Sequence, residues 1–348
     1  MTDFNPTESS DSGGAEKGVR QALMQFLSHK RSTQKESTAR AYKFPNRDFV
    51  EHCEDNDIYT TDEISQRIVT TWIDKRQQED IKPITVKNNV KHVRVFIKWM
   101  GSRELCEWGI HEKMTIPNVP DRGDVNEDVL RTEHAETTLD YLTTYNYATR
   151  YHALLHTLWH TGCRISGAQA LDVQDFEART NEANVLKFRD RPDETPLKNG
   201  QKGNRDVTIS EKLTQILQDY IKRHRLDKED PVGRDPLFTI PSGRMSNQRA
   251  YKNITAVTRP CVTSGECPHD REIEDCEAAQ QKDLSQRCPS AVSMHPVRKG
   301  SITNHINEGW PKEKLSERVD VSVDVLTKHY DFRTAETKRQ NREEYLHE

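Results

Sequence analysis

Hydrophobic residues in the first third of the chain recur at helical spacing, interrupted by short polar breaks. The repeat is clearest between residues 60 and 100, where two runs each place their apolar positions on one helical face. These positions are Ile64, Ile68, Trp72 and Ile73 in the first run, and Val86, Val90, Val93, Ile97 and Met100 in the second. Thr60 and Glu63 have capping-box spacing just before the first run. Residues 18–110 are therefore predicted to form a helical domain.

The pattern changes after residue 110. Residues 111–124 have no apolar periodicity and contain Pro117, Pro120 and Gly123 among charged residues, which is typical of an interdomain linker. Residues 125–348 would then form a second domain.

The second domain is predicted to be mostly helical with a small sheet. Apolar residues recur at helical spacing over 132–160, and again after Ser210, which is a suitable N-cap. Two short β-rich runs, 184–188 and 206–209, flank a turn-rich segment and predict a β-hairpin.

Length and composition fit two polar domains. A chain of 348 residues with 33% hydrophobic and 31% charged residues can bury a core in each. No run approaches the roughly 18 apolar residues of a membrane span. Residues 1–17 are rich in Ser, Gly, Asp and Glu, which predicts a disordered tail and no signal peptide. We therefore expect a cytoplasmic protein with no membrane partner.

The net charge of −4 neither supports nor excludes a nucleic-acid partner, because phosphate contacts depend on local charge. One predicted helix carries a basic face opposite its apolar one. Its cations are Lys87, Lys91, Arg94 and Lys98. Taken alone, such a face is more often a solvated surface than a DNA contact.

Four of the seven cysteines gather in residues 261–288, an apparent insertion. They are Cys261, Cys267, Cys276 and Cys288, with His269 between them. In a reducing compartment such a cluster favours metal over disulfides, and four thiolates, or three with the histidine, could close a tetrahedral structural zinc site. The spacing lacks the tight pairs of a zinc ribbon, so a polar loop with free thiols is the equal alternative.

Three segments of the second domain together carry the residues that metal-free DNA cleavage requires. Two arginines can clamp the non-bridging oxygens of a phosphodiester, and a tyrosine can attack the phosphorus to give a covalent link. A lysine can protonate the leaving 5′ oxygen. The segments are 161–168, 196–207, and 295–300 continued by 328–330.

This combination resembles the tyrosine recombinase family, which includes lambda-type integrases and the recombinases that resolve chromosome dimers. The family's Thr-Gly-x-Arg turn, the Leu and Asp that follow it, its hairpin lysine before Arg-x-Val, its His-x-x-Arg box and its late tyrosine all have matches. The matches are Thr161, Gly162, Arg164, Leu171, Asp175, Lys198, Arg205, Val207, His295, Arg298 and Tyr330. The resemblance covers residues 18 to 340.

The resemblance implies a role for each catalytic match. Arg164 and Arg298 would hold the scissile phosphate, and His295 would assist proton transfer. Tyr330 would form a 3′-phosphotyrosyl bond. Lys198, expected at the end of the first strand of the hairpin and preferred over Lys202 in the turn, would protonate the leaving group. Catalysis would require no cofactor.

The resemblance also implies a fold and partners. The fold would be mainly α with a small β-sheet, with an N-terminal core-binding domain and a C-terminal catalytic domain of the DNA breaking-rejoining fold. The two domains would close on duplex DNA, with the basic helix, Lys202 and Arg205 as contacts. Four copies would assemble on DNA, and residues 332–348 are a candidate for the segment exchanged between them.

Three positions depart from the family pattern. The family usually has Glu where this chain has Gly167, His where it has Lys299, and His or Trp where it has Val321. A divergent active recombinase is the preferred interpretation. A non-cutting, sequence-specific DNA-binding protein on the same fold is the main alternative, and a topoisomerase with the same chemistry is a second.

Overall fold

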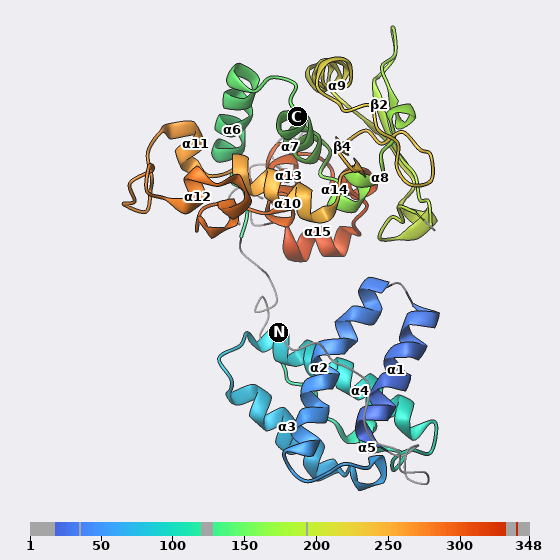
Figure 1. Ribbon diagram of the computed structural model, residues 1–348. Coiled ribbons are helices and arrows are strands. Elements are labelled where there is room, and N and C mark those ends of the chain that lie inside the picture. Colours follow the sequence, from blue (N-terminus) through green and yellow to red (C-terminus); the bar gives the residue numbers. More distant parts are fainter. Residues whose placement is uncertain (1–17, 35, 120–127, 193, 332–338, 340–348) are drawn as a thin grey trace. The chain divides into compact units, whose positions relative to one another are not determined.

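The chain divides into two compact units, residues 1–126 and 127–348, which are described here one at a time (Figure 1). The computed structural model describes residues 18–34, 36–119, 128–192, 194–331 and 339. The predicted tail at residues 1–17 and nearly all of the C-terminal segment 332–348 lie outside the described residues.

The N-terminal unit is helical and is built around three long helices, α1, α2 and α4. Its elements are α1 (Val19–Thr33), α2 (Glu36–Glu54), the 3-10 turn η2 (Thr61–Glu63), α3 (Gln66–Gln78), α4 (Pro83–Gly101) and α5 (Ile110–Lys113). Phe26, Trp72 and Phe96 are fully buried among them. α4 begins on Pro83, where the missing N–H costs nothing because the first turn has no intrahelical acceptor.

Two sequence predictions in this unit need correction. The capping box of Thr60 and Glu63 is present, but it caps η2, and α3 begins later behind Ser65. The linker was predicted to begin at residue 111. Ile110 and Met114 are buried in the N-terminal core, so the first residues of that segment belong to the domain.

The C-terminal unit is mostly helical with small antiparallel sheets, as the sequence predicted. Its first helices are α6 (Thr132–Tyr145), α7 (Arg150–Thr161), α8 (Ile165–Ala170) and α9 (Glu211–Arg223). The main sheet has the order β1-β2-β3, with β1 (Phe176–Glu177), β2 (Val185–Phe188) and β3 (Arg205–Thr208), and a second pairs β4 (Thr239–Ile240) with β5 (Gly243–Arg244). Ser210 caps α9 through a hydrogen bond from the Leu213 N–H at 3.3 Å.

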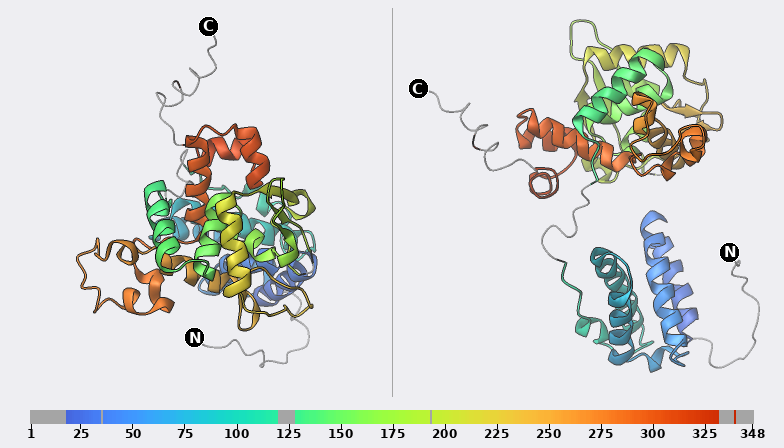
Figure 2. Two further views of the ribbon diagram at one scale, coloured as in Figure 1. Left: turned by 90° about the horizontal axis from the view of Figure 1, so that it is seen from above. Right: turned by 90° about the vertical axis from the view of Figure 1, so that its left-hand side faces the viewer.

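α7 is the central helix of this unit, and nearly all of its residues are buried. It packs against α6, α9 and the later helix α13 (Met294–Asn307), which places residues from distant parts of the chain side by side (Figures 1 and 2). The stretch 132–160 was expected to be continuously helical. It breaks after Tyr145, where Ala148 takes a positive φ of 52° and α7 starts on the cap Thr149.

The C-terminal part of this unit is a helical hairpin mounted on α13. It consists of α14 (Lys312–Val319) and α15 (Val323–His329). A small apolar cluster joins the three helices, and its members are Ile302, Ile306, Leu315, Val319, Val321, Leu326 and Tyr330. Tyr330 is thereby fixed in a packed environment.

The cysteine-rich segment folds as a cap beside α10 (Asn247–Val257). It comprises α11 (Pro260–Ser264), α12 (Glu277–Gln280) and the 3-10 turn η5 (Lys282–Arg287). η5 packs on α10 and on α12, and α11 packs on α6. Among the described residues, none of the helices is both long and apolar enough to cross a membrane.

Candidate active site

The turn after α7 presents the first arginine. Gly162 ends the helix in the left-handed conformation, with φ 58°, and its N–H donates to the Leu158 carbonyl at 3.0 Å. A Cβ at this position would lie 2.9 Å from Cγ1 of Val319, so both the conformation and the space require glycine. Two residues on, Arg164 is the N-cap residue of α8, and its Nη1 donates to Oδ2 of Asp320 at 2.6 Å.

The second arginine, Arg298, comes from α13 and is only 3% exposed. Its Nη1 donates to the Gly162 carbonyl at 2.8 Å and its Nη2 to the Val319 carbonyl at 2.9 Å. Burial, and then the charge of Arg164, lower the pKa of Arg298 to about 10, which leaves it protonated at neutral pH. The two guanidinium groups therefore lie near each other, as a clamp on one phosphate requires.

Tyr330 directly follows α15 and lies near this arginine. Its side chain is 7% exposed and is close enough to the Arg298 guanidinium to raise the pKa of that group, against the larger effects of burial and of Arg164. Its N–H donates to the Leu326 carbonyl at 3.1 Å, and its carbonyl accepts from Oγ1 of Thr303 at 3.2 Å. The backbone on both sides of the phenol is thus fixed to α15 and α13.

His295 lies in the first turn of α13, close to the other candidates. Desolvation, followed by the positive charges around the ring, lowers the pKa of His295, so the neutral imidazole is favoured at pH 7. The cations responsible are Arg298, Lys299, Lys198 and Arg164. All five predicted catalytic side chains therefore lie near one another in the C-terminal unit.

Lys198 lies elsewhere in its hairpin than the sequence predicted. β2 ends at Phe188, and Lys198 follows ten residues later in a long, structured loop. Asp190 holds the loop together, since its Oδ1 accepts from the Leu197 N–H at 2.8 Å and its own N–H donates to Asn204 at 2.6 Å. Lys198 is exposed at the rim of the site.

The other predicted DNA contacts have different surroundings. Lys202 is exposed on the same loop, beside a pocket of about 360 Å³ that Asp320 also lines. Arg205 is used within the protein. Its Nε donates to the Arg318 carbonyl at 2.8 Å, and its guanidinium lies 4.4 Å from the centroid of the Phe188 ring. Arg205 therefore joins the sheet to α14, and its assignment as a DNA contact stays a prediction.

The basic helix of the N-terminal unit is α4. Lys91 and Lys98 are exposed, and Lys87 and Arg94 are half-buried. The spacing of four, three and four residues places all four on one face. Among the described residues no carboxylate pairs with any of them, whereas Lys75 of α3 lies 4.0 Å from Asp55.

The three departures from the family pattern are all in packed positions. A Cβ on Gly167 would lie 3.3 Å from Cδ1 of Phe188, so a larger side chain there would require Phe188 to move by a few tenths of an ångström. Lys299 is 3% exposed, and Val321 is 8% exposed within the apolar cluster of α13, α14 and α15. Sequence reasoning missed Asp320, which no short motif marks.

The cysteine cap contains free thiols only. Burial raises the pKa of Cys261, and the other three cysteines of the cap are near enough to raise it further. Among the described residues no three His, Cys, Asp or Glu side chains are arranged to hold a metal ion. The nearness of the four cysteines to one another is compatible with the zinc hypothesis, which stays a prediction.

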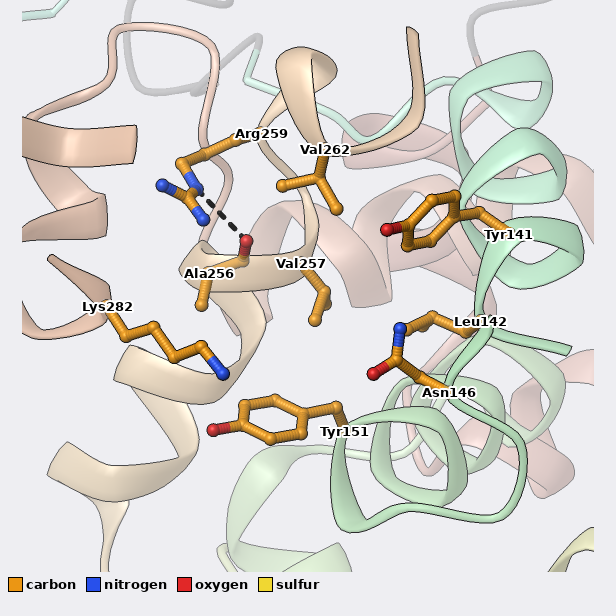
Figure 3. Close-up of a pocket in the computed structure, with 9 residues that line it drawn as sticks. All are labelled: Tyr141, Leu142, Asn146, Tyr151, Ala256, Val257, Arg259, Val262 and Lys282. Atoms are coloured by element: carbon orange, nitrogen blue, oxygen red, sulfur yellow. Dashed lines mark hydrogen bonds between the residues drawn. The ribbon is translucent and has the colours of Figure 1, made fainter. Parts of the chain in front are cut away.

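A separate pocket of about 210 Å³ lies between this cap and α6, α7 and α10 (Figure 3). Tyr141, Tyr151 and Val262 line it, and the Arg259 Nε donates to the Ala256 carbonyl at 3.0 Å beside it. It contains none of the predicted catalytic residues.

The mostly helical fold and the paired arginines with a tyrosine define the class of tyrosine recombinases. The family model of the phage integrase family matches residues 128–336, and the chain belongs to this family. Curated protein sequences gave no match.

Solved structures agree with this fold. The integrase of transposon Tn1549 in complex with a circular intermediate DNA is 16% identical, with a TM-score of 0.66, over 95% of this chain and 100% of that one. The XerH site-specific recombinase bound to a palindromic difH substrate, in a post-cleavage complex, is 15% identical, with a TM-score of 0.62, over 94% of this chain and 84% of that one.

Proposed function

We propose that this protein is a site-specific recombinase that cuts and rejoins duplex DNA through a covalent bond between Tyr330 and a 3′ phosphate. The observation that carries the proposal is the proximity of the Tyr330 side chain to the buried Arg298 guanidinium, with Arg164 nearby. A phosphate held between the two guanidinium groups would present its phosphorus to the phenol oxygen. The burial of Arg298 would strengthen its contact with a phosphate, because solvent screens it less.

The chemistry is an exchange of one phosphodiester for another. Oη of Tyr330 attacks the phosphorus, the P–O5′ bond breaks, and the phenol proton passes to the neutral His295. Lys198 gives a proton to the departing 5′ oxygen. The reverse sequence, with a 5′ hydroxyl from a second strand, rejoins the DNA. The number of phosphodiester bonds is unchanged, so the step needs no ATP.

The basic face of α4 supports duplex DNA as the partner. Within the described part of the chain Lys91 and Lys98 form no ion pair, so they can exchange hydration for phosphate contact without first breaking one. The comparison structures were solved with DNA, and XerH with its difH substrate. Assembly of four copies on two DNA sites, which the family resemblance implies, belongs to the same proposal.

Covalent trapping tests the proposal. Purified full-length chain would be mixed with DNA from its own source, quenched with denaturant and scored for DNA-linked protein. We expect linkage with the wild type and with Tyr145→Phe, a control at a tyrosine that is 71% exposed, and none with Tyr330→Phe. Sequencing the linked ends would give the cut site.

The non-cutting DNA-binding protein predicts another result. Gly167 and Val321 favour it, since both lack the polar group usual in the family. Salt-sensitive DNA binding by the wild type, without linkage on any fragment and with cell extract added to supply accessory factors, would establish that alternative.

A further inference from the structure

The carboxylate of Asp320 joins the three segments that carry the proposed catalytic residues. Its Oδ2 accepts from Arg164 at 2.6 Å, and its Oδ1 accepts from Nδ2 of Asn199 at 2.8 Å. Asn199 directly follows Lys198, and Asp320 ends α14 in the turn that leads to Tyr330. The side chain of Asp320 is 15% exposed, so these contacts are partly shielded from solvent.

Asp320 supplies a negative charge to Arg164 where α8 has none. Gly167 lies one turn beyond Arg164, and a Cβ there would lie 3.3 Å from the Phe188 ring. Phe188 is fully buried, and the Arg205 guanidinium lies 4.4 Å from its ring centroid. A side chain at position 167 would therefore require Phe188 to shift by a few tenths of an ångström, whereas the counter-charge that is present comes from the end of α14.

The surroundings of Arg164 make such a counter-charge necessary. The charges of Arg164 act on both Arg298 and Arg205, so three guanidinium groups share a small volume. Within the described part of the chain, Asp320 is the carboxylate that pairs with Arg164. Without it, repulsion by Arg298 would favour rotamers of Arg164 that point away from the phosphate position.

The backbone holds this carboxylate in place. Asp320 has φ 55° and ψ 57°, a left-handed conformation that aspartate tolerates and that ends α14. Among the residues that the structure describes, contacts are made only through Nη1 of Arg164, which leaves its Nε and Nη2 to donate to a phosphate. The pair therefore fixes the guanidinium without using up its donors.

We infer that Asp320 is a positioning residue of the active site: it orients Arg164 toward the scissile phosphate and fastens the Lys198 loop to the turn before Tyr330. This inference rests on the proposed function. The opposing possibility is that the carboxylate occupies the phosphate position and that DNA must displace it.

The kinetics of DNA cleavage distinguish a positioning role of Asp320 from occupation of the phosphate position. The full-length wild type, Asp320→Ala and Asp320→Asn would be compared on the duplex recovered by trapping, with Asp324→Asn, an exposed aspartate of α15, as the control. We expect Asp320→Ala to slow covalent linkage by about 10- to 100-fold, with a smaller loss for the isosteric asparagine and none for the control. The Kd for DNA should change by less than about threefold, because every phosphate contact except that of Arg164 is retained. Faster linkage with tighter binding would overturn the inference, and would mean that the Asp320 carboxylate occupies the phosphate position until DNA displaces it.

A second substrate distinguishes positioning from general damage. A methylphosphonate at the cut position removes the negative charge that Arg164 clamps. The defect of Asp320→Ala should then shrink to a few-fold, because the orientation of Arg164 no longer matters. An equal defect on both substrates would mean a merely structural role, and would contradict the inference.

A measurement without cleavage keeps the two proposals distinguishable. Urea unfolding of the wild type, Arg164→Ala, Asp320→Ala and the double variant gives the coupling between the two side chains. We expect a favourable coupling. Strictly additive effects would show that Asp320 does not hold Arg164. Failure of the wild type to link to DNA would refute the recombinase proposal. The unfolding cycle would still show whether Asp320 and Arg164 interact.

Discussion

Nη1 of Arg298 donates to the carbonyl of Gly162 at 2.8 Å, which fastens the second arginine to the turn that presents the first. The Val319 carbonyl accepts from the other terminal nitrogen at 2.9 Å, so the guanidinium also holds the end of α14. One buried side chain thus sets the distance between α7, α13 and the helix pair that ends at Tyr330. In the proposed mechanism its positive charge binds the phosphate, while its two hydrogen bonds stabilise the fold.

Arg298→Lys should therefore damage both activity and stability. An ammonium cannot reproduce both directed contacts with the Gly162 and Val319 carbonyls, and one buried carbonyl would lose its donor. We expect covalent linkage to fall by more than about 100-fold and the free energy of unfolding by about 2 kcal/mol. Urea denaturation and trapping on the same preparation measure both. Linkage at the wild-type rate would contradict the proposed clamp.

The turn itself can be tested with two glycines in the same conformation. Gly162→Ala should cost about 3 kcal/mol or more, because left-handed strain adds to the close approach of Val319. Gly265→Ala is the control. Gly265 has φ 72° with nothing within 4 Å of a Cβ, so strain alone should cost about 1–2 kcal/mol. Equal losses of unfolding free energy would show that the contact with Val319 is unimportant.

The short motifs were readable from the sequence because each is governed by local chemistry. The glycine turn before Arg164 and the spacing from Arg298 to Tyr330 follow from helix ends and helix lengths. The contact of Arg164 with Asp320 joins residues 156 positions apart and depends on the left-handed end of α14, which no sequence period reveals.

The position of Lys198 was predicted wrongly for a related reason, since it also depends on contacts between distant side chains. The sequence placed this lysine at the end of a strand, on the assumption of a simple hairpin. Asp190 and Asn204 instead supply side-chain hydrogen bonds that hold a longer loop. Bonds of this kind produce no pattern of alternating polar and apolar residues in the sequence. The buried core of α7 and α13 was easier to predict, because burial does leave such a pattern.

A row of histidines on α7 predicts acid sensitivity. Burial is the main cause that lowers the pKa of His152 and His160 to about 4 and that of His156 to about 3. The unfolded chain binds protons near pH 6.5, whereas the folded chain resists them until about pH 4 or below. Stability should therefore be full above about pH 6.5 and fall as the pH drops from there toward 4.

Thermal unfolding between pH 7.5 and 4 checks this prediction. His156→Leu should flatten the decline, because it removes the histidine with the lowest pKa. His224→Gln replaces an exposed histidine and should leave the slope unchanged. A decline that is the same in all three proteins would mean that His156 stays uncharged in both states or plays no part.

The cysteine cap supplies a metal test. The other three thiols of the cap are near enough to Cys261 to raise its pKa. To bind zinc, the four sulfur atoms would have to lie within about 2.3 Å of the ion. The zinc hypothesis predicts about one ion per chain by elemental analysis of protein prepared without chelator. Cys267→Ser should lose it, and Cys106→Ser, a buried cysteine of the other unit, should keep it. Zinc-free wild type of full stability would support the alternative of free thiols.

The basic face of α4 predicts how DNA binding responds to salt. Each cation that neutralises a phosphate contributes about 0.9 to the slope of log K against log salt concentration. Lys91→Ala with Lys98→Ala should weaken binding to all sequences alike and reduce that slope by about 2. Arg40→Ala is the matched control in the same unit, since this exposed cation already pairs with Glu36 at 3.1 Å. Fluorescence anisotropy on two unrelated duplexes over a range of salt concentrations measures the slopes. An unchanged slope in the double variant would assign the α4 face to solvent and require a different DNA contact in the N-terminal unit.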